Sequence, residues 1–258
     1  MTPQKRTASR VCCISSFRCF SRFLWFKLWK AGKTLNLHIT TADNVTLGAW
    51  FVLSDSYYRD VPFPEPSSYP SLESRVPLAV TARPTVLFFH GNAATRAAPF
   101  RVQYYKLLSN RLGTNVFCID YRGFGDSDGV PSESGLALDA HAAWDWLISN
   151  GADPQNVLIV GHSLGTAVAA KLSADLAAQD VSFRGVVLVS PFSNMKTLLA
   201  AYNFFGFLPL MKPLGWIPGA YGNFFLSISI IDLTTFTYRL RWLFPDAFVQ
   251  YTFCHNGM

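Results

Sequence analysis

The sequence predicts an α/β fold, with a mostly parallel β-sheet, helices on both faces of the sheet and an antiparallel hairpin at its start. Four short apolar runs lack polar alternation, which is typical of parallel strands buried on both faces. Helical segments separate these runs, so strand and helix alternate along the chain. Half of the 258 residues are hydrophobic and 15% are charged, which suits one large domain with a substantial core.

The chain begins with a basic arm, residues 1–33, which holds eight Lys and Arg residues and no acid. The remainder carries 14 basic and 16 acidic residues and is close to neutral. This distribution argues against a nucleic-acid-binding domain, whose basic residues would lie across the folded body. Residues 11–29 interleave Phe, Trp and Leu with Arg18, Arg22 and Lys27, too many charges for a membrane-spanning helix. We expect the arm to contact a membrane surface; a helix packed on the domain or a solvated tail is the alternative.

The first predicted elements form a hairpin. Apolar residues alternate through Leu35, Leu37 and Ile39, Asp43-Asn44 offers a turn, and alternation resumes from Val45. Such a pattern predicts two antiparallel strands joined by a tight connection. Residues 54–84 are rich in Pro, Ser and Tyr and show no period, and we expect them to form a long surface loop.

The next elements alternate between strand and helix. The predicted strands are 85–90, 115–120, 156–161 and 186–190. The first helix begins near Phe100 and leads to Gly113, a suitable residue just past a helix end. The second runs from about 131–132 to Ser149, and the third places Leu164, Val168, Leu172 and Leu176 on one face. In such a sheet, functional groups gather at the carboxyl ends of the strands.

The strongest functional signal is the run Gly161-His162-Ser163-Leu164-Gly165, which follows a predicted strand and opens a helix. A serine nucleophile there stands on a sharp, strained turn with backbone packed closely on both sides, which explains the flanking glycines. The helix directs its N-terminal N–H groups toward the serine oxygen. We expect Ser163 to be the nucleophile and the Leu164 backbone N–H to form half of an oxyanion hole.

Two further motifs end predicted strands. His90-Gly91-Asn92 follows the first buried strand, and a loop at that position can offer a second oxyanion donor, for which we expect the Asn92 backbone N–H. His90 itself suits a loop-organising hydrogen bonder. The run 120–127 (DYRGFGDS) ends the next strand, and we expect it, through Arg122, to hold neighbouring loops. His141 and Asp145 lie one helical turn apart and suggest a surface pair.

The set HGN, DYRGFGDSDG and GHSLG, in this order and strand context, resembles the α/β-hydrolase superfamily, and most closely its membrane-associated lysophospholipase and monoacylglycerol-lipase-like branch. The resemblance extends from about Leu35 to Tyr202. It implies an α/β-hydrolase domain over residues 34–258, with a cap-like segment at 191–222. It also assigns the oxyanion donors to Leu164 and Asn92, in agreement with the reading from the residues.

The C-terminal part departs from this pattern. The superfamily places its acid and then its histidine after the nucleophile, and His255 is the only histidine after Ser163. The acids that follow Ser163 are Asp175, Asp180, Asp232 and Asp246. Strands at 225–231 and 248–254 would end at Asp232 and His255 and rebuild a triad with Ser163. The resemblance favours the other reading, in which the C-terminal part of the fold is incomplete and the family's acid and histidine are missing.

The sequence therefore predicts a serine hydrolase that cleaves carboxylic esters of lipids, of the monoacylglycerol or lysophospholipid type, through an acyl-enzyme on Ser163. The alternative is a catalytically impaired or non-catalytic relative that binds a lipid or a partner. Neither a phosphate-binding Gly-rich loop nor metal-spaced His and Cys residues occur, so no cofactor or metal is expected. We expect membrane association, with the endoplasmic reticulum as one candidate compartment, and otherwise a cytoplasmic protein.

Overall fold

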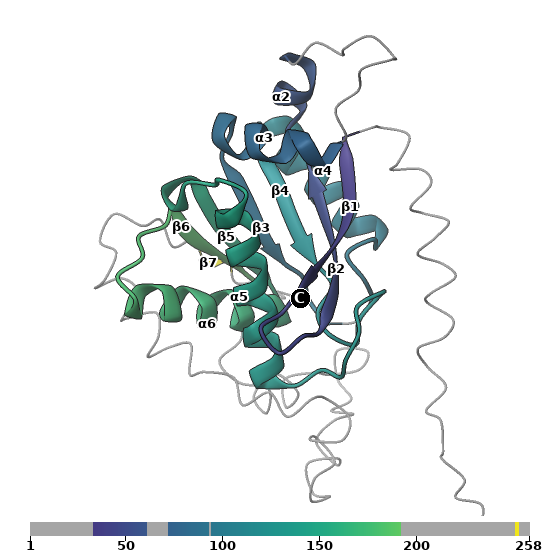
Figure 1. The fold of residues 1–258 in the computed structure, drawn as a ribbon, viewed down its shortest axis with the longest axis vertical. Helices are drawn as coiled ribbons and strands as arrows, with labels where there is room; N and C mark the ends of the chain where they lie inside the picture. Colours follow the sequence, from purple (N-terminus) through teal and green to yellow (C-terminus); the bar gives the residue numbers. More distant parts are fainter. Residues whose placement is uncertain (1–32, 61–71, 93, 192–250, 253–258) are drawn as a thin grey trace, which may run out of the picture.

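A computed structural model describes residues 33–60, 72–92, 94–191 and 251–252 (Figure 1). The strands are β1 Thr34–Thr40, β2 Thr46–Val52, β3 Thr85–Phe89, β4 Asn115–Ile119, β5 Val157–His162, β6 Gly185–Val189 and β7 Tyr251–Thr252. The helices are α2 Asp55–Asp60, α3 Val76–Ala82, α4 Pro99–Arg111, α5 Glu133–Ser149 and α6 Leu164–Ala178, with short 3₁₀ turns η1 Leu72–Arg75 and η2 Pro154–Asn156.

These strands form one sheet in the order β1-β2-β4-β3-β5-β6-β7. The hairpin strands β1 and β2 pair antiparallel, and β2 joins β4 in antiparallel register. From β4 to β7 every neighbouring pair is parallel. The predicted α/β fold with an N-terminal hairpin is confirmed, and each predicted strand from 85 to 190 agrees with the structure within a residue or so at each end.

Helices cover both faces of the sheet. Alternate residues of β3 belong to different cores: Leu87 and Phe89 join one apolar cluster, and Val86 and Phe88 join the other. The first cluster includes side chains of α5 and α6, and the second includes Val102 and Leu108 of α4. Strands buried on both faces need apolar residues at every position, which is why β3, β4 and β5 show no polar alternation.

The predicted surface loop over 54–84 was wrong where the structure describes it. This stretch contains α2, η1 and α3, and Val76, Ala79 and Val80 are buried. Their i, i+3, i+4 spacing is the signature of a helix with one buried face. Pro77 made this stretch resemble a loop. Proline nevertheless fits the first turn of a helix, where its missing N–H has no intrahelical partner.

One end each of α4 and α5 agrees with its sequence signal. Gly113 has a φ of 62°, the left-handed conformation expected just past the end of α4. Ser132 caps α5 by accepting a hydrogen bond from the Gly135 N–H. Within the described ranges, no helix is both long and apolar enough to cross a membrane.

Candidate active site

Ser163 lies on a sharp turn between β5 and α6. Its backbone has a φ of 50° and a ψ of −117°, a conformation that non-glycine residues adopt only at a cost. The Ser163 N–H donates to Val189 O at 3.0 Å, and Ser163 O accepts from the Thr166 N–H at 2.8 Å and from Thr166 Oγ1 at 2.6 Å. Its hydroxyl does not cap α6. The turn is thus held by backbone hydrogen bonds, and α6 does not use the Ser163 hydroxyl as its N-cap.

Close backbone packing surrounds this turn. A Cβ on Gly161 would overlap the carbonyl of Gly165, and a Cβ on Gly165 would overlap the carbonyl of Phe89. No side chain larger than hydrogen fits at either place. The start of α6 therefore lies directly against the end of β3, which brings the loop after β3 to Ser163.

The loop His90-Gly91-Asn92 contacts the Ser163 turn. A Cβ placed on Gly91 would lie 3.2 Å from Ser163 Cβ and 3.1 Å from His162 Nδ1. Asn92 follows at an exposed position, while Leu164, the first residue of α6, is buried. The first N–H groups of a helix have no intrahelical acceptor. The structure thus places Leu164 directly after Ser163, and it places Gly91, the residue before Asn92, against the Ser163 turn.

A buried hydrogen-bond network fixes the loop. His90 is fully buried, with Nε2 3.1 Å from Asp120 Oδ1 and Nδ1 2.8 Å from Gly91 O. Tyr121 Oη donates to His90 O at 2.8 Å. On the other side Arg101 donates to Gly91 O at 2.8 Å and to Thr95 O at 2.7 Å. The structure confirms that His90 organises the loop.

The charges of this network are arranged to be stable when buried. Burial would raise the pKa of Asp120, but the nearby Arg96 guanidinium and the hydrogen bond from His90 outweigh it and hold that pKa below its usual value. Burial lowers the pKa of His90. Arg96 donates both a backbone N–H and its guanidinium to the Asp120 carboxylate. Asp120 is therefore an ionised, buried anchor for the loop that follows β3.

Arg122 ties the next loop to two other elements, as the sequence predicted. It donates through Nε to Asp139 Oδ1 of α5 at 2.8 Å and through Nη1 to Asp43 Oδ2 of the hairpin turn at 2.7 Å. His141, predicted to pair with Asp145, instead contacts Asp175 of α6 at 3.1 Å. The prediction considered only neighbours on one helix, and the packing of α5 on α6 supplied a closer partner.

Arg101 is the site residue that sequence reasoning missed. It stands in the first turn of α4, where the positive end of the helix dipole disfavours a cation. An arginine at such a position signals a specific partner, and here the partners are the carbonyls of the loop. Its burial lowers the pKa of the guanidinium.

Of the acids considered for a triad, the two that the structure describes lie away from Ser163. Asp175 is eleven residues along α6 from Leu164, about 16 Å at the usual rise per residue, and it pairs with His141 and Lys171. Asp180 follows the far end of α6. Asp232, Asp246 and His255 lie outside the described residues, as do the cap-like segment 191–222 after its first residue and the arm before Lys33. The described strand β7 falls within the predicted strand 248–254 and pairs with β6 next to Val189.

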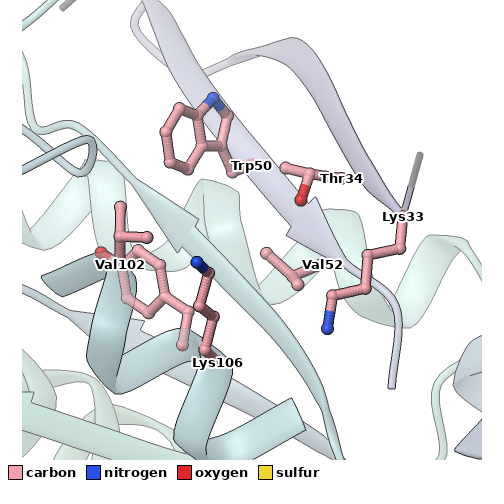
Figure 2. Close-up of a pocket in the computed structure, with 7 residues that line it drawn as sticks. Lys33, Thr34, Trp50, Val52, Val102 and Lys106 are labelled. Carbon is pink, nitrogen blue, oxygen red and sulfur yellow. The ribbon is translucent and has the colours of Figure 1, made fainter. Parts of the chain in front are cut away.

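A shallow apolar pocket is also present, but it belongs to another part of the molecule. It lies between the hairpin and α4, where Trp50 and Val52 of β2 face Val102 and Lys106 (Figure 2). None of its lining residues comes from the loops around Ser163.

Comparisons with known proteins agree with this architecture. Residues 84–245 match the family model described as alpha/beta hydrolase fold. Lysophosphatidylserine lipase ABHD12 of Xenopus tropicalis is 36% identical over 171 residues, which cover 66% of this chain and 42% of that protein. Protein ABHD12B of Homo sapiens is 34% identical over 191 residues, covering 74% of this chain and 49% of that one. The chain thus spans less than half the length of these relatives.

Two solved structures share the fold. An alpha-beta hydrolase from Vibrio vulnificus superimposes with a TM-score of 0.57 at 18% identity, covering 91% of this chain and 79% of that chain. An esterase from Pyrococcus furiosus gives 0.54 at 20% identity, covering 85% and 80%. At these identities the likeness supports the fold alone.

Proposed function

Since this chain belongs to the α/β-hydrolase fold family and is related to the ABHD12 lysophospholipases, we propose that it is a serine hydrolase that cleaves the carboxylic esters of lipids. The observation that carries the proposal is the Ser163 turn. A serine held at a φ of 50°, with its hydroxyl unused by the helix it precedes, costs the fold stability. A catalytic role for Ser163 would explain why the protein keeps this strained backbone conformation.

The proposed reaction proceeds in two steps. Ser163 Oγ attacks the ester carbonyl, its proton passes to a general base, and the alcohol part leaves as the acyl-enzyme forms. Water then attacks the acyl-enzyme and releases the fatty acid, which regenerates the hydroxyl. In both steps the negative charge on the carbonyl oxygen is stabilised by the Leu164 and Asn92 N–H groups.

The substrate class follows from the relatives and the arm. The ABHD12 proteins are named as lysophosphatidylserine lipases, which supports a single-chain lipid ester of the lysophospholipid or monoacylglycerol type. The arm of residues 1–33, with eight cations and no acid, suits an anionic membrane surface that holds such lipids. We therefore also propose that the protein is membrane-associated.

Labelling of the full chain with a fluorophosphonate probe tests the proposal. The parent should become labelled and should hydrolyse p-nitrophenyl butyrate and a long-chain monoacylglycerol, and Ser163→Ala should do neither. A folded parent that is neither labelled nor active would refute the proposal.

The second candidate is a non-catalytic lipid- or partner-binding relative. It is favoured by one observation: His255 is the only histidine after Ser163, and neither Asp175 nor Asp180 lies at the site. His255→Ala separates the two candidates, because labelling that is present in the parent and absent in this variant identifies His255 as the base. Labelling of neither protein, with both folded, favours the second candidate.

A further inference from the structure

One helix of the described fold is apolar on two faces. The inner face of α4 packs Val102, Tyr105 and Leu108 against the sheet. Its outer face presents Phe100, Tyr104 and Leu107, which are 56%, 42% and 53% exposed. These three residues follow the i, i+4, i+7 spacing of a single helical stripe. A stripe of three large apolar side chains on the surface marks a contact with another molecule or a membrane.

The charged residues of the helix that carries the stripe are all basic. Arg111 is exposed and continues the stripe by one turn, the exposed Lys106 lies on the flank of α4 toward Lys33, and α4 contains no acid. Lys33, the first described residue of the chain, donates to Ser109 Oγ of α4 at 3.0 Å. In Figure 2 the side chains of Lys33 and Lys106 lie on either side of Val52. The basic arm therefore joins the folded body beside this helix.

Charge decides which partner fits. The arm, with its eight cations, would place like charges against Lys106 and Arg111 if it covered the stripe. Residues 192–250 contain four basic and two acidic residues and would do the same. A second copy that covered the stripe around a two-fold axis would bring Lys106 and Arg111 of one copy close to the same residues of the other. An anionic lipid surface, by contrast, attracts α4 and the arm together.

We propose that the outer face of α4 is a membrane-docking surface, in which Phe100, Tyr104 and Leu107 enter the lipid interface while Lys106 and Arg111 contact anionic headgroups. Aromatic and aliphatic side chains framed by cations are typical of segments that bind in the plane of a membrane. Docking through α4 also orients the site, because Arg101 of the same helix holds the loop that carries Gly91 and Asn92. The orientation rests on the proposed function; the docking itself does not.

Vesicle sedimentation of the full 258-residue chain tests this surface. All proteins carry Ser163→Ala, so that binding is measured without hydrolysis and independently of the proposed chemistry. The parent should bind phosphatidylcholine vesicles that contain phosphatidylserine and bind pure phosphatidylcholine only weakly. The variant Phe100→Gln/Tyr104→Gln/Leu107→Gln should bind the anionic vesicles at least about tenfold more weakly.

Two matched variants define the controls. Val130→Gln removes an apolar side chain that is 80% exposed outside α4 and should bind as the parent does. Lys106→Gln/Arg111→Gln should bind anionic vesicles more weakly than the parent while keeping the same weak binding to neutral ones. Thermal melts of each protein confirm that the changes, all at exposed positions, leave the fold intact.

Three results would overturn the proposal. The first is a parent that does not bind anionic vesicles. The second is a triple variant that binds them as tightly as the parent, which would assign binding to the arm alone. In the third, size exclusion shows a dimer that the triple variant converts to a monomer with vesicle binding unchanged, which would make the stripe an interface between two copies.

Discussion

Replacing Ser163 by glycine should stabilise the protein relative to replacing it by alanine. Both changes remove the hydroxyl, but only glycine adopts a φ of 50° and a ψ of −117° without strain. That strain costs on the order of 1–3 kcal/mol. Glycine also loses about 0.5–1 kcal/mol through its greater freedom in the unfolded chain. The net difference is about 1 kcal/mol in favour of Ser163→Gly, or about 2–4 °C in melting temperature for a domain of this size.

Urea unfolding at a common m-value, together with thermal melting, measures this difference. The matched control is Ser173 in the interior of α6, where the order reverses: the glycine variant should be about 1 kcal/mol less stable than the alanine variant. If Ser163→Gly proved no more stable than Ser163→Ala, the turn would not be strained, and the structural argument for a reactive serine would fail.

Three further predictions concern the loop beside Ser163. Gly91→Ala places a methyl group 3.2 Å from Ser163 Cβ and should slow fluorophosphonate labelling by about tenfold or more, with a melting temperature close to that of the parent. Unchanged labelling kinetics would show that the loop does not lie against Ser163 in solution. Arg101→Lys keeps a cation but loses the planar guanidinium that donates to both Gly91 O and Thr95 O. The kcat for p-nitrophenyl butyrate should therefore fall by about 10–100-fold with KM little changed, whereas the exposed control Arg59→Lys should have no effect. A rise in KM alone would contradict this role of Arg101. The pKa of Asp120 is depressed in the folded state, so the stability that its carboxylate contributes is present above the pKa of the unfolded state and is lost as the pH falls through the pKa of the folded state. Urea midpoints between pH 7 and 3 should therefore fall less steeply for Asp120→Asn than for the parent or for the exposed control Asp145→Asn. Parallel curves for all three proteins would exclude this linkage.

Much of the architecture could be predicted from local patterns. Apolar runs marked the parallel strands, and Gly113 and Ser132 marked helix ends, because each of these signals depends on a few neighbouring residues. The segment 54–84 could not be predicted in the same way. Its helix α3 is seven residues long, too short for a periodic signal to stand out, and its burial depends on contacts with distant parts of the chain.

The site was predicted to a similar extent. Ser163 could be expected on the turn between β5 and α6 because strand, turn and helix fix where a residue at a strand end must lie. The oxyanion roles of Leu164 and Asn92 stay predictions. Arg101 was missed because its partners are carbonyl oxygens ten residues or fewer away; its place in the first turn of a helix was the one signal, and it names no partner. His141 was paired with the wrong acid because the choice between Asp145 and Asp175 depends on how α5 packs on α6.

The close approach of Gly165 to the end of β3 has a consequence for how this protein can change over evolution. The contact between the start of α6 and the end of β3 is made by main-chain atoms, and no side chain takes part in it. In the hydrolase proposed above, side-chain substitutions around the substrate would therefore leave this backbone contact unchanged. Under that proposal, we expect substrate preference to be easier to change by mutation than the position of Ser163.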